Sequence, residues 1–352
     1  GHLGTSASAA GNIVTELGDL DSELETSNQH LQDMEQELAN IKGSIDAAQL
    51  RIDTIGETLH SDVDYQTPVR VEQSKASSNF TQDSFVSAVL KAKEHIKDGD
   101  IFQLVLSQRF ERKTTVAPTT LYRALRTINP SPYMFHLIMK DFDIIGASPE
   151  LLVKVDDGTV EIRPIAGTRH RGRTEAEDKT LANDLINDEK ECAEHLMLLD
   201  LGRNDVGRVS EFGSVTIPEH MVIENYSHVM HIVSDVKGKL ASGKDPFDAL
   251  MSGFPAGTVT GAPKIRAMEI INDLEPDRRN IYSGAIGFFD FTGNVNTCIA
   301  IRTMIMKDQT VHFQSGAGIV HDSDPTKEFE ETLNKAKAIM TAINFAENGL
   351  VS

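Results

Sequence analysis

The chain has 352 residues, of which 39% are hydrophobic and 25% are charged. This composition is ordinary for a globular protein, and it excludes a collagen-like, a wholly disordered or a disulfide-stapled chain. Asp and Glu outnumber Lys and Arg by 53 to 34, which gives a net charge of −19. Because nucleic acids and anionic membrane surfaces are themselves negative, the charge argues against both as partners.

Two further features concern the cellular compartment. No run of residues is long and apolar enough to span a membrane, and the first residues lack the basic and apolar segments of a secretory signal. The only cysteines are Cys192 and Cys298, which is typical of a protein from a reducing compartment. The sequence therefore predicts a cytoplasmic protein.

The first sixty residues differ from the rest in charge and in pattern. They contain eleven acidic residues and only two basic ones, Lys42 and Arg51. Apolar residues recur at spacings of four and three over about six heptads, interrupted only at Ser27. Residues 1–64 are therefore expected to form a helical module, as a coiled coil or as a hairpin that turns at Gly43. Two roles are expected for its apolar face: packing on the chain's own second domain, or self-association. The heptad positions are Ile13, Leu17, Leu20, Leu24, Leu31, Met34, Leu38, Ile41, Ile45, Ala48, Ile52, Ile55 and Leu59.

A second domain is predicted over residues 65–352, after a polar connector that includes a short strand at residues 69–72. Helical periodicity predicts helices over residues 85–96, 121–127, 175–199, 246–251, 263–272 and 325–347. Strands are predicted over residues 101–106, 133–139, 144–147, 151–155, 160–163, 227–233, 286–291, 296–306 and 311–314. Because several strands follow one another without a helix between them, the fold class is expected to be α+β with antiparallel sheets.

Two of the predicted helices carry glutamates three residues apart. Glu191 and Glu194 lie on the first helix, and Glu328 and Glu331 lie on the second. Residues at this spacing share one face of a helix. If the two faces meet, four carboxylates would surround a hard divalent cation, and ligation by oxygen alone favours Mg²⁺ over zinc. Each pair by itself is also the pattern of a solvated helix face.

Other segments have the composition of anion sites. Residues 315–319 follow a predicted strand, and their small side chains would let backbone N–H groups face a carboxylate or phosphate. Arg302 on the preceding strand could bind a carboxylate through two N–H groups. Residues 164–172 combine glycines with cations, which suits an anionic ligand or a plain turn. His231 lies in a strand-like run, where a structural histidine is the simpler interpretation.

Five segments, in this order along the chain, resemble the motifs of the chorismate-binding enzymes. They are residues 164–168, 188–195, 201–205, 254–264 and 315–320. The similarity extends over about residues 80–345 and is greatest to component I of the anthranilate synthases. The resemblance implies a fold of two packed antiparallel β-sheets with outer helices and an active site between the sheets.

The resemblance also implies roles for individual residues. Glu194 and Glu331 would bind Mg²⁺ directly, with Glu191 and Glu328 close by or acting through water, and the metal would hold the ring carboxylate of chorismate. The implied substrate-binding residues are Gly167, Tyr282, Arg302, Gly316, Ala317, Gly318 and Lys335, and the implied catalytic residues are Gln103, Glu150, Thr168 and His231. Glu150 would protonate the departing C4 hydroxyl, and His231 would assist the later loss of pyruvate.

Two positions separate this sequence from sister enzymes that it resembles. Isochorismate and salicylate synthases place a lysine where Gln103 stands, and that lysine activates water. Aminodeoxychorismate synthases typically carry a lysine at the position of Ala166, and its amine can attack C2 of the substrate. Gln103 and Ala166 favour free ammonia as the attacking group and anthranilate, a precursor in tryptophan biosynthesis, as the product. Aminodeoxychorismate and isochorismate synthesis are the alternatives.

The resemblance further implies a partner. Neither cysteine lies in a Gly-x-Cys-x-Gly elbow, so no glutaminase site is recognised in this sequence. A separate glutamine amidotransferase, component II, would therefore supply the ammonia. Free ammonium could take its place. The region that begins full component I chains is not recognised here. In the resembled enzymes that region supplies one half of a tryptophan pocket, and only the other half, residues 129–134, is found in this sequence. Half a pocket would bind tryptophan weakly, which predicts little feedback inhibition. An alternative of another class is a catalytically inactive assembly module built on the coiled coil.

Overall fold

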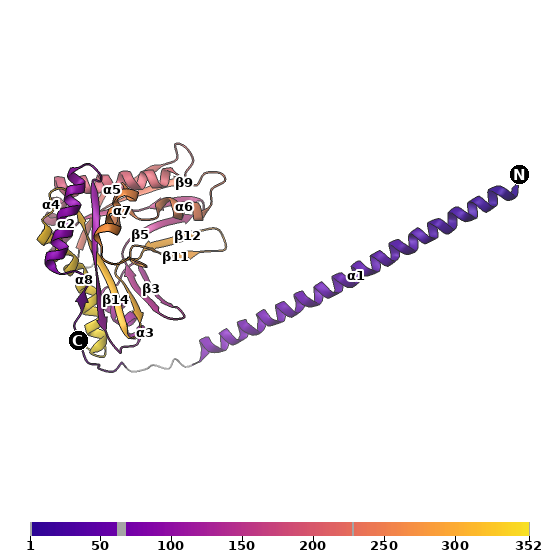
Figure 1. The fold of residues 1–352 in the computed structure, drawn as a ribbon, viewed down its shortest axis with the longest axis horizontal. Coiled ribbons are helices and arrows are strands. Elements are labelled where there is room, and N and C mark those ends of the chain that lie inside the picture. Colours follow the sequence, from indigo (N-terminus) through magenta and orange to yellow (C-terminus); the bar gives the residue numbers. More distant parts are fainter. Residues whose placement is uncertain (1, 62–67, 227–228, 352) are drawn as a thin grey trace. The chain divides into compact units, whose positions relative to one another are not determined.

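The computed structural model describes residues 2–61, 68–226 and 229–351. The chain divides into two compact units, Gly1–Gln66 and Thr67–Ser352. Helix α1 (His2–His60) forms the first unit and continues through Gly43, so the predicted hairpin is wrong (Figure 1). One interior glycine costs a helix only about 1 kcal/mol relative to alanine, which is too little to end a helix of this length. The large apolar heptad residues from Leu17 to Leu59 are all exposed, by 52% at Ile41 and up to 78% at Leu59.

The second unit contains two antiparallel sheets. In the first sheet the order is β1 (Ser77–Ser78), β2 (Gln103–Lys113), β14 (Thr310–Ile319), β13 (Thr303–Lys307), β4 (Asp143–Ser148) and β3 (Tyr133–Ile138), and β10 (Gly261–Ala262) also pairs with β2. In the second sheet the order is β11 (Ala285–Phe289), β12 (Val295–Ile299), β5 (Leu151–Asp156), β6 (Thr159–Ile162), β9 (Val229–Lys239) and β7 (Ile165–His170), and β8 (Thr216–Asn225) also pairs with β9. The predicted α+β class is confirmed.

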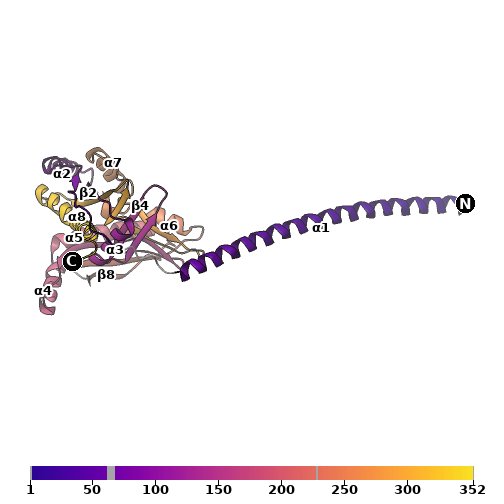
Figure 2. The same ribbon diagram turned by 90° about the horizontal axis from the view of Figure 1, so that it is seen from below.

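Helices cover both sheets with apolar faces. The helices are α2 (Gln82–Lys97), α3 (Pro118–Ile128), α4 (Glu175–Ile186), α5 (Glu189–Gly207), α6 (Pro246–Gly253), the short 3-10 helix η1 (Gly257–Val259), α7 (Lys264–Leu274) and α8 (Pro325–Glu347). Leu125 of α3 and Ile343 of α8 pack on the first sheet, and Leu199 of α5 and Ala249 of α6 pack on the second. Helices α2 and α8 lie side by side (Figure 1, Figure 2). Within the described residues, no helix combines the length and apolar character needed to cross a bilayer.

Aspartate caps begin the two helices that carry the paired glutamates. Asp188 accepts hydrogen bonds from the backbone N–H groups of Lys190 and Glu191, and α5 begins directly after it. Asp324 does the same for α8, whose first residue is Pro325. Such caps contribute about 1 kcal/mol each to helix stability. They fix the first turns of α5 and α8, where Glu191 and Glu328 lie.

Several predicted boundaries are wrong. The helix predicted over residues 175–199 is two helices, α4 and α5, because the chain bends at Asn187 and Asp188 caps a new helix. The strand predicted over residues 296–306 is β12 and β13, which belong to different sheets. Residues 165–170 form strand β7, residues 315–319 lie inside β14, and residues 69–72 form no strand. Strand β8 was not predicted, and residues 227–228 lie outside the described residues.

The chain passes directly from one sheet to the other at two connections, after β4 and after β12. They lie side by side: the N–H of Ile299 donates to the carbonyl of Glu150 over 3.0 Å, and the N–H of Ala147 donates to the carbonyl of Arg302 over 3.1 Å. Arg302 has a φ of +51°, which is uncommon for a residue with a side chain. Glu150 and Arg302 therefore lie on adjacent connections between the sheets.

Candidate active site

Glu150 lies in the connection after β4 and has the properties of a proton donor. Burial raises the pKa of its carboxyl to about 7, although the positive charges of Lys335 and Arg302 act in the opposite direction. At neutral pH a carboxyl with this pKa exists in both protonation states. It can therefore donate a proton to a leaving group, as expected of a general acid.

His231 on β9 has the properties of a neutral base. Its Nδ1 lies 2.9 Å from the carbonyl of Gly167 and 3.0 Å from Oγ1 of Thr168. Because a carbonyl can only accept, Nδ1 is assigned the proton, which leaves the lone pair on Nε2. Burial lowers the pKa of His231, which favours this uncharged form.

A β-bulge in β7 places these groups together. Ala166 pairs with Ile232 and Thr168 pairs with His231, so Gly167 is the extra residue on its strand. Gly167 has a φ of +71°, which favours glycine, and a Cβ there would lie 3.1 Å from Oε2 of Glu191. The bulge brings the backbone of β7 close to both His231 and helix α5.

Glu194 of α5 contacts Gln103 of β2. Its Oε1 accepts a hydrogen bond from Nε2 of Gln103 over 3.1 Å. Burial raises the pKa of Glu194, and the nearby charges of Glu191 and Glu331 add to the effect. A Cβ on Gly318 would lie only 2.7 Å from Nε2 of Gln103, so this glycine of β14 leaves room for the contact.

Helix α8 supplies the second pair of glutamates and a lysine. Burial raises the pKa of Glu328, and the charge of Glu331 contributes. Lys335 Nζ lies 2.7 Å from Oε1 of Glu331 and donates to the carbonyl of Gly316 over 3.0 Å. The glutamates of α5 and α8 are therefore close enough to influence one another, as the effect of Glu331 on Glu194 also indicates.

The donor chemistry of this cluster fits Mg²⁺, since all four predicted ligands offer carboxylate oxygens. As the side chains stand, no three His, Cys, Asp or Glu residues of the described chain converge on one point suited to a metal ion. Glu331 is paired with Lys335, and Glu191 is paired with Arg169 over 3.1 Å. Direct ligation of a metal ion by either of these two carboxylates would require its pairing to change.

Strand β14 and Tyr282 form the opposite part of the site. Strand β13 pairs only with residues 310–313 of β14, so within the described chain residues 315–319 pair with β2 alone. A Cβ on Gly316 would lie 3.0 Å from the hydroxyl oxygen of Tyr282. Burial raises the pKa of Tyr282 to about 12, so its hydroxyl remains a hydrogen-bond donor at neutral pH. The side chain of Ala317 is buried in the core with the apolar residues of α2, so it makes no side-chain contact in the site.

The cations of residues 164–172 are bound by the chain itself, which sequence reasoning missed. Arg169 pairs with Asp184, Asp188 and Glu191. Arg171 pairs with Asp178 and also donates to the carbonyl of Tyr226 over 2.6 Å. These two guanidinium groups already have carboxylate partners, so they tie the end of β7 to neighbouring helices.

Comparison with known proteins identifies the family. Residues 15–341 match the model of the family described as chorismate binding enzyme. Anthranilate synthase component 1 of Aquifex aeolicus is 58% identical over 270 residues, which cover 77% of this chain and 55% of the relative. The chain thus spans about half the length of that curated relative.

Two solved structures resemble the fold. The crystal structure of anthranilate synthase component I from Streptococcus pneumoniae TIGR4 is 45% identical, has a TM-score of 0.78, and is matched over 84% of this chain and 66% of its own. The menaquinone-specific isochorismate synthase from Escherichia coli, at 20% identity and a TM-score of 0.73, covers 80% of this chain and 66% of its own. The second likeness concerns the fold alone.

Proposed function

The chain belongs to the chorismate-binding enzymes, and from this premise we propose that it acts as an anthranilate synthase component I. It would convert chorismate and ammonia into anthranilate, pyruvate and water, as a step of tryptophan biosynthesis. The observation that carries the proposal is that Glu150, a carboxyl with a raised pKa, lies on the connection beside that of Arg302 and within electrostatic reach of Arg302 and Lys335. A general acid beside cations suits a substrate with two carboxylates and a hydroxyl that leaves poorly.

In the proposed reaction, each group of the site has a separate task. Arg302, Tyr282 and the backbone of Gly316 and Gly318 bind the enolpyruvyl carboxylate, and Lys335, Gly167 and Thr168 complete the pocket. Glu150 gives its proton to the C4 hydroxyl as ammonia adds at C2 and water leaves. Nε2 of His231 then accepts the C2 proton as pyruvate departs and the ring becomes aromatic.

Mg²⁺ would be held by Glu194 and Glu331, with Glu191 and Glu328 acting near it or through water. When bound, it would neutralise the ring carboxylate and draw electron density from the ring. Gln103 and Ala166 support ammonia as the attacking group, because neither supplies a nucleophilic amine. Gln103 Oε1 is buried and has no hydrogen-bond partner within the described structure, so it can accept a hydrogen bond from an incoming small molecule.

Two partners belong to the proposal. A glutamine amidotransferase would supply ammonia, as the designation component 1 of the relatives suggests. A second copy of the chain would bind through α1, whose large heptad residues are exposed. With Leu17 at position a, Glu37 falls at g and Lys42 at the next e, a pair of opposite charges that suits a parallel coiled coil.

The deciding experiment follows anthranilate fluorescence in a mixture of the full chain, chorismate, Mg²⁺ and ammonium, with and without EDTA. We expect anthranilate to form and EDTA to abolish its formation. If isochorismate or aminodeoxychorismate is the main product, the proposal is wrong and the chain is the corresponding sister enzyme. A folded oligomer that yields none of the three would instead be an assembly module. Half-inhibition by micromolar tryptophan would refute the expected lack of feedback control.

A further inference from the structure

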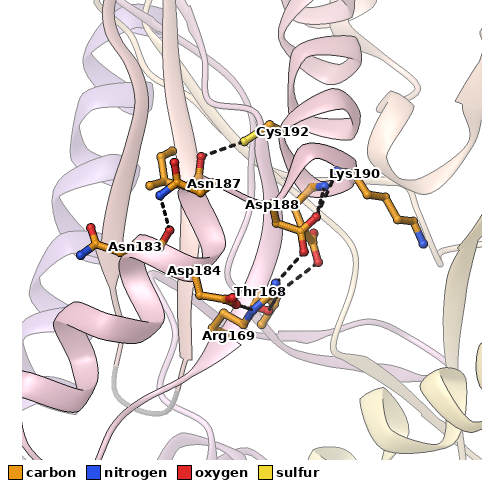
Figure 3. Close-up of polar contacts among 10 residues, drawn as sticks. Thr168, Arg169, Asn183, Asp184, Asn187, Asp188, Lys190 and Cys192 are labelled. Carbon is orange, nitrogen blue, oxygen red and sulfur yellow. Dashed lines mark hydrogen bonds and ion pairs between the residues drawn. The ribbon is translucent and has the colours of Figure 1, made fainter.

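Arg169, at the end of β7, makes several polar contacts, although the proposed reaction gives it no role. Its Nε donates to Oδ2 of Asp184 over 2.8 Å, its Nη2 to Oδ2 of Asp188 over 2.8 Å, and its Nη1 to Oε1 of Glu191 over 3.1 Å. Nη1 also donates to the carbonyl of Thr168 over 3.0 Å. Figure 3 shows the guanidinium between Asp184 of α4 and the beginning of α5. One side chain thus joins β7, α4 and α5.

The same contacts fix the helix that carries two of the proposed metal ligands. Oδ1 of Asp188 caps α5 by accepting from the N–H groups of Lys190 and Glu191, over 3.0 Å and 3.1 Å, and Oδ2 is left for Arg169. A planar guanidinium can hold several carboxylates in fixed directions, which a lysine ammonium cannot do. Arg169 therefore sets both the start of α5 and the side-chain direction of Glu191.

The glutamate is confined from two sides. Arg169 holds Oε1 of Glu191, while Oε2 lies so close to Gly167 that a Cβ there would be 3.1 Å away. An unpaired glutamate side chain would keep the rotamer freedom that is lost when it is fixed. Without the guanidinium, Glu191 would also face the like charges of Asp184 and Asp188.

We propose that Arg169 is a positioning residue for the metal site, which fixes the carboxylate of Glu191 in place beside the ion. The inference rests on the proposed magnesium site. Groups that orient the carboxylates of a metal site support metal binding, and their removal typically lowers metal affinity by about 10- to 100-fold. The proposed direct ligands are Glu194 and Glu331, which Arg169 does not contact.

The test measures binding of Mg²⁺ alone to the full chain by isothermal titration, without substrate. Arg169→Gln is expected to weaken Mg²⁺ binding by about tenfold, and Arg169→Lys by less, because it keeps the charge but loses the planar fork. Arg171→Gln is the matched control: Arg171 lies two residues away and also pairs with an aspartate, Asp178, but contacts none of the proposed ligands. It should leave the Mg²⁺ affinity unchanged.

A second variant separates failure of this inference from failure of the proposed function. Glu194→Ala should abolish Mg²⁺ binding. If Glu194→Ala does so but Arg169→Gln and Arg169→Lys bind Mg²⁺ as the wild type does, Arg169 is merely structural and the inference is overturned. If Glu194→Ala binds Mg²⁺ normally, the metal site itself is wrong. Turnover gives an independent readout: for Arg169→Gln, the Mg²⁺ concentration at half-maximal rate should rise about tenfold, with the rate largely restored at saturating Mg²⁺.

Discussion

The two units of this chain differ in where their stabilising contacts come from. In α1 the large apolar residues of the heptads are exposed, and the side-chain hydrogen bonds found there join residues four apart. In the second unit, polar partners lie far apart in sequence, as with Arg112 and Glu347, which are 235 residues apart and pair in the core. The heptad pattern thus defines a helix but not what its apolar face packs against. The second unit, in contrast, is stabilised by contacts within itself.

The strongest test of the second unit is Glu150→Gln, which removes the proposed acid while keeping size and polarity. We expect the rate to fall by about 10²- to 10⁴-fold, because general acid catalysis contributes that much. In the wild type, the acid form is lost as pH rises through about 7, so the rate at constant NH₃ should decline there. The variant should lack this decline. A pH profile shared by both proteins would exclude Glu150 as the acid.

The buried ion pair offers the next largest effect. Arg112→Ala is expected to lower the free energy of unfolding by about 3 to 5 kcal/mol, because it leaves Glu347 charged and unpaired in the core. Lys239→Ala is the control, since Lys239 and its partner Glu211 are exposed, and it should cost less than about 1 kcal/mol. Urea unfolding measures both. Equal losses would contradict the contrast between buried and surface pairs.

A smaller effect is expected in α1. Ser27→Leu fills the one polar heptad position and should stabilise a self-associated α1 by about 1 to 3 kcal/mol per chain, the free energy of burying a leucine. Ser22→Leu, off the apolar stripe, is the matched control. Sedimentation at several protein concentrations should show tighter association for Ser27→Leu only. An unchanged monomer in both would refute self-association.

Deleting residues 1–66 should have the smallest effect on turnover. The two units are separately compact, and every proposed site residue lies in the second. We expect the kcat and KM with ammonium to stay within about twofold of the full chain, while any association through α1 is lost. Loss of activity from a folded truncation would show that α1 takes part in the site.

Elements with local signals were predictable. Helix α8 was predicted over residues 325–347, as observed, because a capping aspartate and a proline begin it and its apolar period continues to the end. Strand β3 was also predicted to within one residue. The family fold followed from motifs that the chain shares with its relatives.

What the sequence could not indicate depends on contacts between distant residues. The break between β12 and β13 follows from the left-handed backbone of Arg302, which no local pattern signals. Strand β8 escaped notice because its register against β9 shifts twice and Met221 has a φ of +52°. The pairing of Arg169 requires α4 and α5 to meet β7. The only sequence signal for it was the pair of acidic residues Asp184 and Asp188, four positions apart on either side of the bend.

The two side-by-side connections between the sheets have a mechanical consequence. Glu150 and Arg302 each sit on a strap of a few residues that is anchored in both sheets, and each strap hydrogen-bonds to the end of the strand that leads into the other. Any sliding of one sheet past the other would pull on both straps at once. The acid and its neighbouring cation would then shift together, so thermal shear of the sandwich would disturb their spacing less than if either rode on a free loop.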